Sequence, residues 1–150
     1  MSSNFIDPTN PVVALCAEGM AIEGAPAEAR RLFEQAWDAR QDDFDAAIAA
    51  HFLARHQSTP EATLHWNALA VHHAEAVTDG RAASLLSSLY LNLGDAQANI
   101  GDTVAAAASA ERAADHLESV APGGYREFVA FAIRRLAARV SSATETEPVA

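Results

Sequence analysis

Apolar residues recur along this chain at spacings of three and four, and no segment alternates apolar and polar residues over the length of a strand. The three-to-four spacing places apolar side chains on one face of an α-helix. Glycine, proline and capping residues divide the pattern into seven helix-sized segments. The expected helices span residues 11–23, 26–40, 43–56, 60–78, 81–99, 103–120 and 125–140. The pattern therefore predicts an all-α protein.

Capping residues precede several of these segments. Asn10 stands before Pro11, Asp42 stands before the third segment, and Thr59 stands before Pro60. Short polar side chains accept hydrogen bonds from the free N–H groups of a first turn, and proline suits the first helical position. These residues predict the starts of the first, third and fourth helices.

The segments pair into helical hairpins, and two of the hairpins resemble each other in sequence. Each has a small residue, a turn glycine and a second small residue at matching positions, which are Ala17, Gly24 and Ala29 in one and Gly94, Gly101 and Ala106 in the other. A middle hairpin matches less well, because Gln57 stands where the turn glycine is expected. Its Ala62 is 33 residues after Ala29 and 44 before Ala106. The sequence thus indicates a repeat with about ten extra residues around 71–81, which are expected to lengthen the fourth and fifth helices.

This pattern resembles the tetratricopeptide repeat (TPR) over residues 12–118. The resemblance implies three antiparallel helical hairpins in a right-handed superhelix, closed by a capping helix at 125–140. The helical domain is expected over residues 11–140, with disordered residues 1–10 and 141–150 on either side. The chain also resembles a group of small, uncharacterised bacterial TPR-like proteins, through the segments AAHFLARHQ, HWN and SLYLNLGD.

The expected capping helix has one broad apolar face and several arginines. The apolar face consists of Phe128, Val129, Ala132, Ile133, Leu136 and Val140, and the arginines mostly off it are Arg126, Arg134, Arg135 and Arg139. An apolar flank of this helix could pair with its copy in a homodimer.

Composition excludes several classes of function. The net charge of −10 disfavours nucleic-acid binding, because phosphate backbones repel an acidic chain. No apolar run is long enough to span a membrane, and the first residues lack the regions of a signal peptide, so a cytoplasmic location is expected. Cys16 is the one cysteine; it excludes an internal disulfide and is expected to be buried among apolar residues.

Five of the six histidines lie between residues 51 and 73. Two metal ligands on one helix need a spacing of three or four, and no two of these histidines have it. A metal site assembled across helices stays open, but no metal or other cofactor is expected. A catalytic set is also open, in which Ser88 approaches His51 and Asp95 orients the base.

The TPR resemblance implies a third interpretation, in which the first helix of each hairpin lines a concave groove. The polar residues carried onto that groove are Glu18, His51, Arg55, Ser88, Asn92, Asp95 and Asn99. His51 and Arg55 share a helix face, whereas His56 points elsewhere and is interpreted as incidental. An arginine between acids suits a mixed or cationic ligand. Alternatively, His51 and Arg55 are solvated or paired with Glu18 and Asp95.

The sequence therefore predicts a non-catalytic module that binds a protein or peptide segment in the concave groove. The alternative is a small-molecule-binding protein or an acid–base enzyme centred on His51, Arg55 and Asp95.

Overall fold

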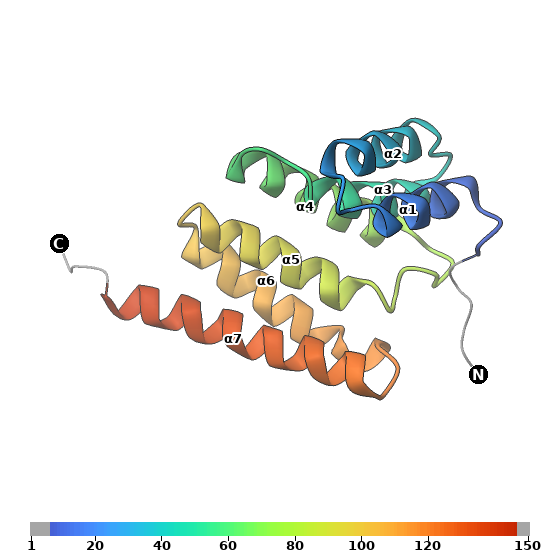
Figure 1. Cartoon of the computed structure of the whole chain (residues 1–150). Coiled ribbons are helices and arrows are strands. Elements are labelled where there is room, and N and C mark those ends of the chain that lie inside the picture. The colour runs from blue at the N-terminus through green and yellow to red at the C-terminus, as the bar shows by residue number, and fades with distance from the viewer. Residues whose placement is uncertain (1–6, 147–150) are drawn as a thin grey trace. The chain divides into compact units, whose positions relative to one another are not determined.

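The structure of this chain is a computed structural model that describes residues 7–146 (Figure 1). Within those residues it contains only helices and no strand, so the all-α prediction is confirmed. The helices are α1 (Pro11–Ala21), α2 (Pro26–Asp38), α3 (Asp43–Ala54), α4 (Pro60–Ala76), α5 (Leu86–Asn99), α6 (Thr103–Asp115), η1 (Leu117–Ser119) and α7 (Gly124–Thr146). The disorder predicted for residues 1–6 and 147–150 lies outside the described residues.

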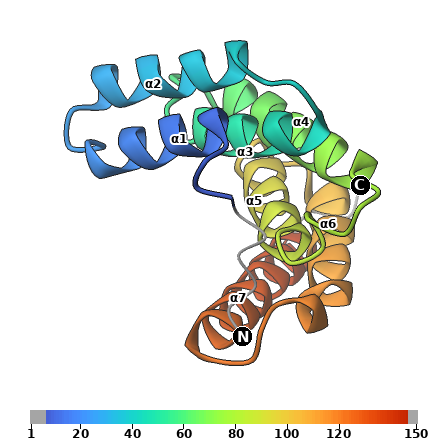
Figure 2. The same cartoon turned by 90° about the vertical axis from the view of Figure 1, so that its right-hand side faces the viewer.

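The chain divides into two compact units, residues 1–82 with α1–α4 and residues 83–150 with α5–α7. In the first unit, α1 pairs with α2 and α3 with α4, and α3 packs against both α1 and α2. Figure 2 shows α1 and α2 running antiparallel. In the second unit, α5 pairs with α6, and α7 packs against both. Each unit therefore contains a helical hairpin with a third helix packed across it, while a single domain over residues 11–140 stays a prediction.

The three predicted N-caps are confirmed. The side chains of Asn10, Asp42 and Thr59 accept hydrogen bonds from backbone N–H groups in the first turns of α1, α3 and α4. Asn10 also donates from Nδ2 to the buried carboxylate of Asp45, at 2.7 Å, which ties the start of α1 to α3. The sequence predicts the local caps, whereas the hydrogen bond between Asn10 and Asp45 forms only when α1 and α3 come together in the fold.

The sequence predicts that the extra residues between the second and third hairpins lengthen α5. This prediction is wrong. Residues 77–85 form an irregular connection between Ala76 and Leu86. Asp79 accepts hydrogen bonds from the backbone and side chain of Arg81, and Gly80 adopts a φ of 85°. Arg81 also bonds to Asp42 and lies over the ring of Phe44, 4.5 Å from its centroid. These contacts hold the start of the connection against α3.

Two other predicted helix ends are wrong. α6 ends at Asp115 instead of about Val120, and the 3₁₀ helix η1 follows it. α7 continues to Thr146, six residues beyond the predicted end at Val140, because residues 141–146 contain no glycine or proline to stop it. Among the described residues, no helix is long and apolar enough to cross a membrane.

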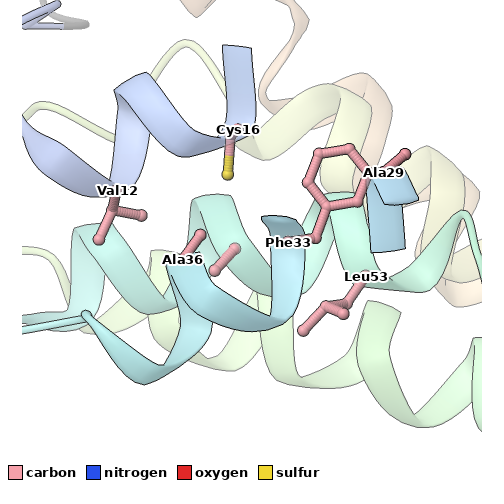
Figure 3. Close-up of a cluster of buried hydrophobic side chains, with 7 residues drawn as sticks. Val12, Cys16, Ala29, Phe33, Ala36 and Leu53 are labelled. Atoms are coloured by element: carbon pink, nitrogen blue, oxygen red, sulfur yellow. The ribbon is translucent and has the colours of Figure 1, made fainter. Parts of the chain in front are cut away.

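The core of the first unit is built where helices approach closely (Figure 3). Its buried side chains are Val12, Cys16, Ala29, Phe33, Ala36, Ala49 and Leu53. A Cβ on Gly19 would stand 2.5 Å from the Phe33 ring, so glycine is what lets α1 meet α2. Ala17, the small residue that the repeat pattern matches to Gly94, is exposed instead, because the turn after α1 begins at Ile22 and is one residue longer than the turn after α5.

Cys16 is buried in this core, as predicted. Burial, with a smaller contribution from Asp45, raises the pKa of its thiol to about 12. The thiolate is therefore not available as a nucleophile near neutral pH. Trp66 packs edge-on against Trp37, with ring centroids 5.0 Å apart.

The core of the second unit joins α7 to the α5–α6 hairpin. Val129, Ile133, Leu136 and Val140 are buried, and a Cβ on Gly94 would stand 2.6 Å from Leu136 Cδ2. Between α5 and α6, Ser87 Oγ donates to the carbonyl of Ala113 at 2.8 Å. Phe128 was predicted to share the apolar face of α7, but its side chain is exposed.

Candidate functional site

A polar cavity of about 390 Å³ lies between α5 and α7 in the second unit. It is lined by Asp95 from α5 and by Arg135 and Arg139 from α7, with Ala132 and Leu136 as apolar lining. Figure 2 shows α7 alongside α5 and α6. This volume lies within the range typical of small-ligand sites.

Local packing explains why these charges meet. Gly94 lets α5 approach Leu136 on α7, and Asp95 is its immediate neighbour. Arg135 and Arg139 flank Leu136 in sequence and are one helical turn apart, so both project on the same side of α7. The close approach of two backbones therefore brings one carboxylate and two guanidinium groups to one cavity.

The electrostatics of the cavity favour an anionic ligand. Arg139 Nη2 donates to Asn99 Oδ1 at 3.0 Å, which fixes the guanidinium at the cavity. Burial raises the pKa of Asp95, while Arg139 acts in the opposite direction. Two permanently charged arginines face one acid, and a guanidinium has five N–H donors, so the cavity offers hydrogen bonds to a carboxylate.

The four predicted site residues on α5 share one side of that helix, with spacings of four, three and four. Asp95 lines the cavity and Asn99 orients Arg139. Ser88 Oγ donates to the carbonyl of Leu85 at 3.1 Å, in the first turn of α5. Asn92 is half-buried between these two ends.

The other three predicted site residues lie in the first unit. Glu18 is exposed, and Arg55 does not pair with it. Instead Arg55 makes a bidentate contact with Glu23, through Nε at 3.0 Å and Nη2 at 2.9 Å. Glu23 lies in the turn that follows α1, whereas Glu18 lies more than one helical turn earlier. The pairing of Arg55 with Glu18 that the sequence left open is therefore wrong, and its pairing with Asp95, which lies in the other unit, stays a prediction.

His56, interpreted from the sequence as incidental, belongs to the same cluster. Its Nε2 lies 2.8 Å from Glu23 Oε2, and its ring lies 5.3 Å from that of Phe33. Burial acts to raise the pKa of Glu23, but the hydrogen bonds of His56 and Arg55 outweigh it and leave that pKa below its usual value. The cluster binds the turn after α1 to the end of α3.

His51 stands beside this cluster. Burial and the charge of Arg55 lower the pKa of His51 to about 4, and Glu23 opposes them only in part. The imidazole is therefore neutral at pH 7. Its ring packs edge-on against Phe52, with centroids 4.9 Å apart.

The structure bears only in part on the metal and catalytic alternatives. Among the described residues, no group of three or more His, Cys, Asp or Glu side chains could hold a metal ion. Ser88 and Asp95 are seven residues apart on α5, hence about 10 Å along its axis. His51 lies in the other unit, so the catalytic alternative stays a prediction.

The sequence missed the contribution of α7 to the site. The sequence pattern places Arg135 and Arg139 off the apolar face, and their spacing of four puts them side by side. Their meeting with Asp95 required the packing of Leu136 on Gly94.

Comparison of the chain with protein-family models, with curated proteins and with solved structures finds no match.

Proposed function

We propose that this chain is a non-catalytic, TPR-type module that binds a peptide or protein segment, and that the α5–α7 cavity holds an acidic group of that partner. The observation behind the proposal is the cavity itself, where Arg135 and Arg139 face Asp95 over an apolar lining. Arginine pairs that share a fixed geometry recognise carboxylates by bidentate, charge-assisted hydrogen bonds.

The arrangement of helices supports the TPR-type assignment. In each unit a third helix packs against both helices of a hairpin, which is how successive hairpins stack in helical repeat arrays. Such arrays bind partners along helix faces, and the predicted polar residues of α5 share one side of that helix, on which Asp95 and Asn99 are exposed.

The charge of the cavity changes the expected ligand. From the sequence, one arginine between acids suited a mixed or cationic partner. With Arg135 and Arg139 added from α7, the cavity has two positive charges against the one negative charge of Asp95. An acidic side chain or a C-terminal carboxylate is thus a better partner than a basic one.

A display selection tests the proposal. The full chain is immobilised and a library of random twelve-residue peptides is passed over it. The proposal predicts enrichment of peptides rich in Asp and Glu, and loss of that enrichment with Arg139→Gln. Arg31→Gln, which removes an exposed arginine of α2, is the matched control and should retain it. Equal enrichment by both variants, or none by the wild type, would refute the proposal.

A further inference from the structure

α7 exposes three aromatic side chains that its packing does not use. Tyr125 is 59% exposed, Phe128 is 65% exposed and Phe131 is 53% exposed. They are half of the six exposed large hydrophobic residues among those that the structure describes. Water-exposed aromatic rings gathered on one helix often mark an interaction surface, because each ring gains free energy when a partner covers it.

These rings continue into the arginines of the cavity. From Tyr125 the spacing runs three to Phe128, three to Phe131, four to Arg135 and four to Arg139, so the five side chains follow one side of the helix. The guanidinium carbon of Arg135 lies 5.9 Å from the centroid of Phe131, within cation–π range. We call these five residues the aromatic–arginine stripe.

The stripe is separate from the core face of α7. Val129, Ile133, Leu136 and Val140 are buried and follow an adjoining face of the helix. The rings of Phe128 and Phe131 are therefore not needed to hold α7 on the α5–α6 hairpin.

Charge complementarity indicates what covers the stripe. The chain has a net charge of −10, yet α7 has four of its ten arginines and two acidic residues, Glu127 and Glu145. This local excess of positive charge next to exposed rings attracts a segment that is both acidic and apolar.

We propose that the aromatic–arginine stripe recognises an extended peptide whose acidic group enters the α5–α7 cavity and whose aromatic or large apolar side chain covers Phe128. This inference rests on the proposed function and adds a second contact to it. Phe128 is about 10 Å from Arg135 and about 16 Å from Arg139 along the helix axis. An extended peptide rises about 3.3 Å per residue, so the two recognised side chains are about three to five residues apart.

Defined peptides test this spacing. The first probe is a labelled ten-residue glycine–serine peptide with one phenylalanine and, four positions away, two adjacent glutamates. A second peptide replaces the phenylalanine by serine, and a third replaces the glutamates by glutamines. Each peptide is made in two versions, with the phenylalanine or the serine that replaces it either before or after the two acidic or amide positions. Binding to the full chain is followed by fluorescence anisotropy.

The first peptide should bind about tenfold more tightly than the second, the gain expected from burying part of one aromatic ring. Phe128→Ser should remove this advantage and leave binding of the second peptide unchanged. Val104→Ser, which removes an apolar side chain of α6 that is 82% exposed, should keep the advantage. Arg139→Gln should weaken binding of both acidic peptides.

The outcomes separate the two proposals. Equal binding of the first and second peptides by the wild type would overturn the inference and leave the acidic-group proposal standing. Failure of both acidic peptides to bind, or equal binding of the third, would overturn the proposed function as well. If Phe128→Ser instead changes the mass measured by sedimentation, or binding to anionic vesicles, the stripe serves a second copy or a lipid surface and the inference is wrong.

Discussion

Gly19 shows how one residue decides whether two helices can meet. The nearest atom to an added Cβ at this position is Phe33 Cε1, only 2.5 Å away in a ring that is completely buried. Gly19→Ala should therefore destabilise the chain by about 1–3 kcal/mol, the usual cost of overpacking a core. The change is measured as the free energy of unfolding in urea.

Gly24→Ala is the matched control. Gly24 lies five residues further on, has nothing within 4 Å of an added Cβ and does not adopt a positive φ. Alanine there should leave stability unchanged or raise it by up to about 1 kcal/mol, because it restricts the unfolded chain. Similar losses for the two variants would contradict the packing of α1 on Phe33.

His51 makes stability depend on pH. Its pKa is about 4 in the folded chain against 6.5 for the unperturbed side chain, so unfolding takes up a proton between these values. Its contribution to stability is complete above pH 6.5 and is lost as the pH falls towards 4. The melting temperature should therefore drop less between pH 7 and pH 5 in His51→Gln than in the wild type. An equal drop would show that His51 titrates normally.

Contacts between residues close in sequence were predictable, and contacts between residues far apart in sequence were not. The caps at Asn10, Asp42 and Thr59 depend only on the next three residues, so sequence alone located them. The partners of Arg55 and His56 depend on where the turn after α1 comes to lie. Many acidic residues could have filled that role, and only folding selects Glu23.

At the scale of single elements, α7 has one face that is buried in the core and one that is exposed. Leu136 is buried against Gly94, whereas Phe128 is exposed. Leu136→Ala should cost about 2–4 kcal/mol through the cavity that it leaves, and Phe128→Ser should change stability by less than about 0.5 kcal/mol. Urea unfolding of the two variants compares these values directly. A large loss for Phe128→Ser would place that ring in the core.

The existence of helices was easier to predict than their ends and faces. The three-to-four periodicity identified all seven α-helices within the described residues. It did not show that residues 77–85 form a connection, because that depends on the contacts of Arg81 with Asp42 and Phe44. It also assigned Phe128 to the apolar face of α7, since a broad apolar stripe does not say which of its edges a neighbouring helix covers.

At the scale of the whole molecule, charge is distributed unevenly. An acidic chain places four arginines on α7, and two of them meet Asp95 at one cavity. Composition predicted the overall acidity and the classes of partner that it excludes. It could not predict the local reversal of charge, because that arises only when α7 packs against α5.

The most direct test of the acidic-partner claim is an NMR titration of the ¹⁵N-labelled full chain with the glutamate-bearing peptide. The resonances that move most should belong to Asp95 and Asn99 on α5 and to Arg135 and Arg139 on α7. The arginine Nε–H signals should shift as the carboxylates bind. Shifts confined to α1–α4 would contradict the claim that the α5–α7 cavity is the binding site. Binding of the peptide without a shift of these four residues would contradict it as well.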